Sequence, residues 1–301
     1  MKRYIKDNYK EILVYLLLYI SLILGFWHNE NLTVGAFWDY NETKGIAKDF
    51  IIDFKDTFLN FDKHQTRHSP IFVIIISKLI EIFKNDTIVR LIHLHFLLLL
   101  PYIFYLCLKE KFSFHQKNLL FLFSSVILIS PIFRSISIWP DSRNIGTLFF
   151  LISLLFFLKF EKNENFKDSI FCILFYAISS YLSPNFSILS IYFFYKFFHY
   201  YKFSKNFLTI FILNLFLVIP ALYYIFYLDI NFLFKSAIYG GDVDLKLWFN
   251  YSNKFFCISA IALFYLIPFI LSKLVTIDIK KIFSDKVIIL FLTIFFLIGL
   301  F

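Results

Sequence analysis

Charged residues are few in this chain, and glycine and methionine are fewer still. Only 17% of its 301 residues are charged, and it has seven Gly, seven Pro and one Met, whereas an ordinary globular protein is about 25% charged. A water-soluble fold is therefore not expected. The small number of Gly and Pro excludes a fibrous repeat, and the strongly apolar composition excludes disorder.

Cysteine is also rare. Cys107, Cys172 and Cys257 all lie inside apolar runs and show no CxxC spacing. The sequence therefore predicts neither a disulfide framework nor a zinc site. We expect the three thiols to be small packing residues.

The chain is rich in apolar and aromatic side chains. Hydrophobic residues make up 59% of it and aromatic residues 23%, with 45 Phe and 19 Tyr, a composition that indicates a polytopic membrane protein. The formal net charge of +9 is then explained first by basic residues in the loops, which orient the chain in the bilayer. This charge does not call for nucleic acid as a partner.

Apolar runs between charged residues predict an all-α membrane protein of about nine transmembrane helices, forming a single domain over residues 1–301. A span needs about 20 mostly apolar residues. The runs are roughly 11–28, 87–108, 118–134, 144–160, 168–183, 185–200, 207–228, 254–272 and 287–301. Because the first run leads into GFWHNEN and not into a small-residue cleavage site, we expect a retained span.

Two segments leave the topology open. The apolar run Pro70 to Phe83 has only 14 residues and carries Lys78 and Glu81, which favours a buried or interfacial helix over a span. The runs 168–183 and 185–200 are short for two crossings and could instead form a re-entrant hairpin. The chain also stops inside an apolar run, so we expect either a short or a truncated protein.

The basic residues favour a cytoplasmic N-terminus. With that orientation the cytoplasmic loops carry 17 Lys and Arg, against 11 in much longer outer loops, as the positive-inside rule requires. Residues 29–86 then form a long first outer loop with interfacial helices. Within it, residues 43–61 place Ala47, Phe50, Ile51, Phe54 and Phe58 at helical spacing, which predicts an amphipathic helix in the interface plane.

Polar residues gather in three places on the predicted outer side. They are Asp39 in FWDYNET, the segment HQTRHSP at residues 64–70, and Asp141 in RSISIWPDSRN at residues 134–144. Taken singly, Asp39 and Asp141 could be helix N-caps, and outer Arg residues could meet lipid phosphate. Taken together, acids that serve as base or ligand and cations that hold a phosphate suit a reaction between a lipid-linked phosphate donor and a hydroxyl acceptor.

The order of these elements resembles the membrane-embedded type-C glycosyltransferases, which include protein O-mannosyltransferases, lipid A aminoarabinose transferases and lipopolysaccharide-core sugar transferases. The resemblance covers about residues 10–200. The matching positions are Asp39 and Ala47 for the acidic motif DE..Y...A, His68-Ser69-Pro70-Ile71 for HPPL, Arg90 at the head of the next span, and Pro140-Asp141 for the Pro-Asp of the fourth span.

The chain departs from the family pattern at three positions. Tyr40 replaces the second acid of the DE pair, although Glu42 is near; Ser69 replaces the first Pro; and Ser183-Pro184 stands where many members carry Lys-Pro. These departures bear on metal use and on binding of the donor phosphate more than on the fold.

The resemblance implies an inverting transfer of a sugar from a polyprenyl-phosphate donor to a glycan, lipid or protein acceptor at the outer face. It makes Asp39 the base or acceptor-orienting acid and Asp141 its partner, both opening on one cavity. The implied contacts for the substrate and its phosphate are Arg67, His68, Arg90, Arg134, Arg143 and Glu42.

A divalent metal is possible in this scheme, with Asp39 and His68 as ligands. His64 and His68 are four residues apart and could share a helical face. His93 and His95 are two apart on a helix, cannot share a face, and are expected to be core or helix-contact residues.

The implied location is the bacterial inner membrane, among membrane lipids, with the site on the outer face. A transporter or flippase of a lipid-linked or small substrate is the main alternative. We see no internal repeat and almost no Asp or Glu inside the spans, which is unlike the transporter pattern. A non-catalytic membrane scaffold is the third interpretation.

Overall fold

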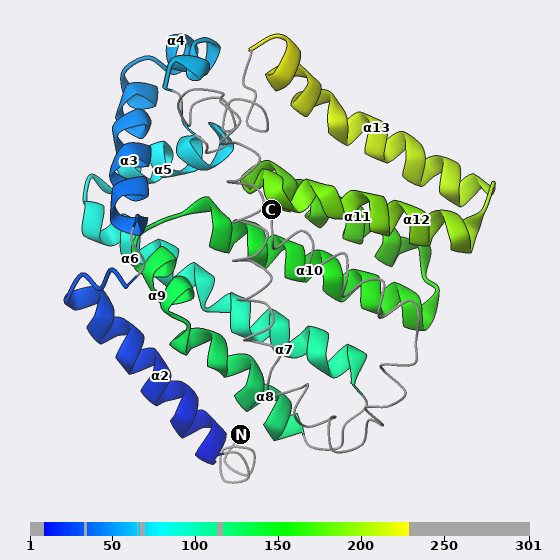
Figure 1. The fold of residues 1–301 in the computed structure, drawn as a ribbon, viewed down its shortest axis with the longest axis horizontal. Helices are drawn as coiled ribbons and strands as arrows, with labels where there is room; N and C mark the ends of the chain where they lie inside the picture. Colours follow the sequence, from blue (N-terminus) through cyan, green and yellow to red (C-terminus); the bar gives the residue numbers. More distant parts are fainter. Residues whose placement is uncertain (1–8, 33–34, 65, 67–69, 113–116, 229–301) are drawn as a thin grey trace, which may run out of the picture. The chain divides into compact units, whose positions relative to one another are not determined.

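The computed structural model describes residues 9–32, 35–64, 66, 70–112 and 117–228, all of which belong to the unit Met1–Phe232. Regular structure in these ranges is entirely helical (Figure 1). The helices are α2 (Tyr9–Trp27), α3 (Ala36–Ile52), α4 (Phe54–Leu59), η1 (Phe61–His64), α5 (Pro70–Phe83), α6 (Asp86–Leu97), α7 (Leu99–Lys111), α8 (Lys117–Ser125), η2 (Val126–Ile129), α9 (Pro131–Ile138), α10 (Ser142–Asn163), α11 (Phe166–Leu182), η3 (Pro184–Leu189), α12 (Ser190–Tyr201) and α13 (Lys205–Phe226). The predicted all-α class is thus confirmed for this part of the chain.

Among the described residues, three helical segments are long and apolar enough to cross a membrane. They are Asp86–Lys111, which joins α6 and α7, Ser142–Asn163 and Lys205–Phe226. A fourth exists if the bent pair Asn118–Ile129 and Pro131–Ile138 is one span, and Ile12–Trp27 is a shorter apolar helix. Their length and apolar composition are consistent with an integral membrane protein. The predicted runs 254–272 and 287–301 lie outside the described residues, so the count of nine stays a prediction.

The predicted span 118–134 is not straight. Its two halves meet at Ser130 and are bent by 64°. Pro131 is the first residue of α9, and the Ser130 hydroxyl accepts a hydrogen bond from the Phe133 backbone N–H. A proline ring cannot continue an incoming helix but suits the first position of a new one, so the run becomes two helices.

A proline also separates the runs predicted at 168–183 and 185–200. Ser183 has an extended backbone, as residues before proline prefer, and Pro184 starts η3. On either side of this break α11 has 17 residues and α12 has 12. Both are below the length of a full span, and the choice between two crossings and a hairpin stays open.

The amphipathic helix predicted over residues 43–61 is interrupted at Asp53. Its side chain accepts a hydrogen bond from the Asp56 backbone N–H at 2.9 Å and caps α4. The helix restarts at this residue, and the predicted apolar positions do not share one environment. Ala47 and Phe50 are buried, while Ile51 and Phe54 are exposed. The prediction of one continuous helix over residues 43–61 was therefore wrong.

Helix α3 packs on the short apolar helix α5. The buried side of α3 includes Tyr40, Ala47 and Phe50, and that of α5 includes Phe72 and Ile76. All of them belong to one core cluster, to which α2, α6, α9 and α10 also contribute. The predicted helix at Pro70–Phe83 is confirmed with one side buried and Ile75 and Ile82 exposed, and α3 packs on its buried side.

A second core cluster lies farther along the chain. It joins α10, α11, α12 and α13 through Phe157, Phe160, Cys172, Phe197 and Ile210. The buried thiols of Cys107 and Cys172 are packing residues, as expected.

Gly146 lets α10 and α11 come close together. A Cβ on it would lie 2.8 Å from the Ser183 Cβ, and its carbonyl accepts a hydrogen bond from the Ser179 hydroxyl at 2.8 Å. The core thereby fixes the start of α10, where the polar residues gather.

Candidate functional site

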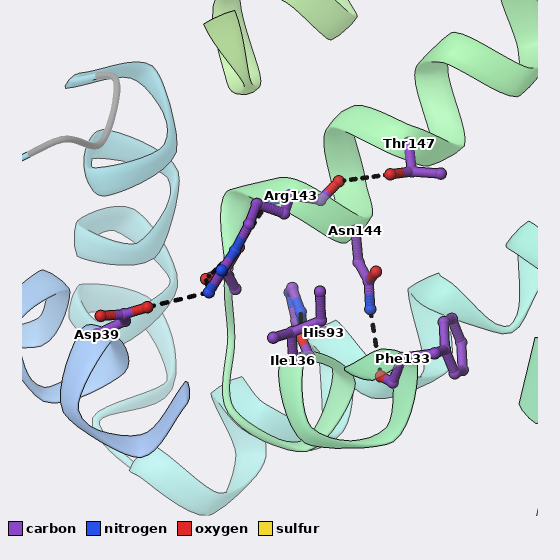
Figure 2. A network of polar contacts seen from close by, with 8 residues as sticks. Asp39, His93, Phe133, Ile136, Arg143, Asn144 and Thr147 are labelled. Atoms are coloured by element: carbon purple, nitrogen blue, oxygen red, sulfur yellow. Dashed lines mark hydrogen bonds and ion pairs between the residues drawn. The ribbon is translucent and has the colours of Figure 1, made fainter. Parts of the chain in front are cut away.

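Two acidic side chains that are far apart in the sequence meet at one arginine, Arg143, which Figure 2 shows beside Asp39. The Arg143 Nη2 group donates to Asp39 Oδ2 at 2.9 Å and to Asp141 Oδ2 at 2.6 Å. Arg143 Nε also donates to Asp141 Oδ1 at 2.9 Å and Oδ2 at 3.0 Å. Asp39 and Asp141 therefore lie in one cluster, with a guanidinium between them.

Asp141 is the buried member of this cluster. Its side chain is 0% exposed, against 50% for Arg143 and 38% for Asp39. It is the N-cap of α10 and accepts the Arg143 backbone N–H at 2.6 Å. A buried carboxylate must be paired with a cation and hydrogen-bonded. Arg143 provides both the opposite charge and the hydrogen-bond donors. The N-cap alternative is thus correct for Asp141.

Asp39 lies in the first turn of α3 but is not its N-cap. That position belongs to Gly35, whose φ of 117° is one that residues with a side chain rarely adopt, and whose carbonyl accepts the Asp39 backbone N–H at 2.7 Å. The Asp39 carboxylate is partly exposed. Its Oδ1 has no hydrogen-bond partner among the described residues, and Figure 2 shows one carboxylate oxygen directed away from Arg143.

Aromatic rings lie beside Asp39. The Phe37 ring packs edge-on against Trp139 at a centroid distance of 4.7 Å and against Trp38 at 5.6 Å. Trp38 is 70% exposed although it directly precedes Asp39. Apolar surface next to a partly exposed carboxylate lowers the local dielectric and strengthens its charge interactions.

Two contacts hold the segment before Asp141 in place (Figure 2). His93 Nε2 lies 3.2 Å from the Ile136 carbonyl oxygen, and the Asn144 amide donates to the Phe133 carbonyl at 3.3 Å. They tie α9 to α6 and to α10. The expected packing role of His93 is confirmed, and His95 likewise contacts the Tyr19 hydroxyl at 3.0 Å on α2.

Arg90 is buried inside the protein. It donates to the Ile138 carbonyl at 3.1 Å and to Asn29 Oδ1 at 3.0 Å. Its guanidinium carbon lies 3.7 Å from the centroid of the Trp139 ring and 4.8 Å from that of Phe26, a cation–π arrangement. Only Nη2 has no partner among the described residues. The structure therefore uses Arg90 mainly to join α6 to the segments around it.

Arg134 is paired with an acid that the sequence analysis did not single out. Arg134 Nε donates to Glu30 Oε1 at 2.6 Å and Nη2 to Oε2 at 2.5 Å, and both side chains are largely buried. Nη1 donates to the Ser21 hydroxyl at 3.2 Å. Glu30 stands in the GFWHNEN segment that follows the first run, but nothing local in the sequence indicates a partner about a hundred residues away.

Tyr40, which stands where the family carries a second acid, has a structural partner. It is 1% exposed, and its hydroxyl donates to Asp86 Oδ1 at 2.7 Å. Burial, reinforced by the bond to Asp86, raises the pKa of the Tyr40 hydroxyl, so it stays neutral. Lys44 pairs with the same Asp86 oxygen at 3.1 Å. The sequence analysis missed both Asp86 and Lys44.

The remaining residues named in the sequence analysis are Arg67, His68, Glu42 and His64. Arg67 and His68 lie outside the described residues. Glu42 is exposed on α3, and the structure shows no ion pair between it and another described residue. His64 ends η1 and packs its ring against Phe61 at 5.9 Å.

Within the described ranges, no three His, Cys, Asp or Glu side chains are grouped as metal ligands would be. Asp39, one of the two expected metal ligands, is instead paired with Arg143, which also pairs with Asp141. A search of protein-family models finds none that matches this chain, and no curated protein or solved structure matches it either.

Proposed function

We propose that the protein is a membrane sugar transferase of the type-C kind, which moves a sugar from a polyprenyl-phosphate donor to a hydroxyl-bearing acceptor. The observation that carries this proposal is the cluster of Asp39, Arg143 and Asp141, in which one carboxylate is partly exposed and the other is buried. This cluster lies at the end of an apolar helix long enough to span a membrane. A charged site at the end of a span suits a substrate that is itself half lipid.

The three residues have different parts in the proposed reaction. Asp39 Oδ1 takes the proton of the acceptor hydroxyl. As it does so, the hydroxyl oxygen bonds to the anomeric carbon and the bond from that carbon to the phosphate oxygen breaks, so the phosphate leaves with the electron pair and the configuration inverts. Arg143, held by Asp141 at the start of α10, keeps Asp39 in position. Asp141 is thus a positioning residue and not a second acid facing the substrate.

The net charge of the cluster supports a role in binding the acceptor hydroxyl. Two carboxylates and one guanidinium carry a net negative charge, which favours a neutral hydroxyl over a phosphate. Arg90 and Arg134 are committed to contacts within the protein. We therefore assign the donor phosphate to other cations, and Arg67 and His68 remain the candidates that the family resemblance supplies.

The test is to replace Asp39 with Asn in a host whose own copy of the gene is deleted. Loss of a general base lowers a rate by about 10²–10⁴-fold, so the sugar that depends on this protein should fall to the level of the deletion strain. Asp49→Asn is the matched control, because Asp49 is an exposed acid on the same helix. Mass spectrometry of the envelope glycans measures the sugar, and an immunoblot measures the amount of protein.

Three results would contradict the proposal. Full glycans with Asp39→Asn, when the deletion removes a sugar, exclude Asp39 as the base. Full glycans with both Asp39→Asn and Asp141→Asn leave the scaffold interpretation as the better one. A deletion strain with unaltered glycans but altered uptake or export of a lipid-linked compound would favour the transporter.

A further inference from the structure

Few side chains of helix α13 are buried by the described part of the chain. The helix is 22 residues long, and over its most apolar 18 residues only 6% is buried by the described protein. Large apolar side chains such as Leu215, Phe216 and Ile219 are more than half exposed. A helix of this length and composition is a candidate membrane span, and apolar side chains exposed on a span face either lipid or other protein.

A groove runs between α12 and the first half of α13 (Figure 1 shows the two helices joined by a short turn). Its volume is about 530 Å³, within the range of roughly 300–1,000 Å³ usual for ligand pockets. The walls are mainly the rings of Phe194, Phe198, Phe207 and Phe211.

These rings support one another. Phe207 lies 5.2 Å from Phe194 and 5.1 Å from Phe198 between ring centroids. Phe194, Phe198 and Phe211 nevertheless stay between 36% and 41% exposed. The groove is therefore an apolar trough with one open side, of a shape that suits an alkyl chain.

One end of the groove is polar and positively charged. Ser204 and Lys205 line it there, and Ser204 caps α13 by accepting the Phe207 backbone N–H. Lys205 is exposed and forms no ion pair with another described residue. Nearby Lys196 differs, because it pairs with Glu161 at 3.1 Å. An unpaired lysine beside a helix N-terminus favours an anionic oxygen group.

We propose that this groove is a binding site for an anionic glycerophospholipid, with one acyl chain along the phenylalanine wall and the phosphate at Lys205. The proposal does not depend on sugar transfer. An amphiphile with an apolar tail and a negative head matches both ends of the groove, whereas a neutral or zwitterionic lipid matches only the wall. One lysine near a membrane surface favours anionic lipid by about fivefold.

The test uses the full chain in nanodiscs that contain phosphatidylglycerol or phosphatidylcholine with the same photoreactive acyl chain. After irradiation, mass spectrometry of peptides locates and counts the cross-links. We expect cross-links on residues 194–211 to be about fivefold more frequent with phosphatidylglycerol. Lys205→Gln should remove this preference, and high salt should weaken it.

Lys162→Gln is the matched control, since Lys162 pairs with Glu110 and does not line the groove. It should leave the preference unchanged. Equal cross-linking by both lipids overturns the proposal. So does an absence of cross-links at the groove while other spans are labelled, which would mean that protein covers it, either another part of this chain or a second copy.

Discussion

At the scale of the residue, two helical glycines differ in the space around them. Gly25 is buried in α2, and a Cβ there would lie 2.2 Å from Glu30 Oε2 and 2.7 Å from Arg134 Nη2. Gly45 lies in the interior of α3, and a Cβ there would meet nothing within 4 Å. Gly25 thus makes room for the Glu30–Arg134 pair, whereas Gly45 has no such role.

We expect Gly25→Ala to destabilise the protein by about 1–3 kcal/mol, as overpacking usually does, because the methyl group would push Glu30 away from Arg134. Gly45→Ala should instead stabilise α3 by about 0.5–1 kcal/mol, through the better helix propensity of Ala. Unfolding of both variants in detergent measures the two effects. Equal stability of the variants would show that the Glu30–Arg134 pair yields easily to the added methyl group.

At the scale of the element, one hydroxyl of α11 makes two hydrogen bonds to the backbone of α13, in addition to the apolar packing between these helices. Tyr181 donates to the Leu217 carbonyl at 2.6 Å and accepts the Ala221 backbone N–H at 3.0 Å. In a regular helix these two backbone groups would bond to each other. The Tyr181 hydroxyl bridges them directly beside Pro220, a residue that interrupts helices.

Tyr181→Phe should remove this bridge and loosen α13 from α11. The loss of one hydrogen bond costs about 0.5–1.5 kcal/mol, and the backbone amides near Ala221 should exchange faster in hydrogen–deuterium exchange. Tyr223→Phe is the control, because Tyr223 is 41% exposed on the same helix. If exchange in α13 does not change in Tyr181→Phe, the bridge does not hold this helix.

At the scale of the whole molecule, charge asymmetry predicts that the N-terminus is cytoplasmic and the Asp39 cluster is outside. Exposed positions in the described part of the chain offer a direct test: Lys55 in α4 is predicted to be outside and Glu164, between α10 and α11, inside. In intact cells, a membrane-impermeant maleimide should label Lys55→Cys and not Glu164→Cys. The unmodified chain gives the background of the native thiols, and the reverse pattern would invert the topology.

Local signals in the sequence predicted several helices closely. The runs 11–28 and 207–228 correspond to α2 (Tyr9–Trp27) and α13 (Lys205–Phe226). They could be predicted because length and hydropathy are properties of a continuous segment. The break at Ser130 was missed, although Pro131 is visible in the sequence, because an apolar run long enough to span conceals a bend.

The sequence by itself determined that the chain is helical and apolar enough for a membrane, and it singled out Asp39 and Asp141. Only the tertiary structure decided that Arg143 pairs with both of these acids and that Arg134 forms an ion pair with Glu30. It also decided that Arg90 lies against the rings of Phe26 and Trp139. The physical reason is that an ion pair between distant residues depends on how helices pack. The periodicity and composition of one segment do not indicate which charged residue of another segment will pack against it.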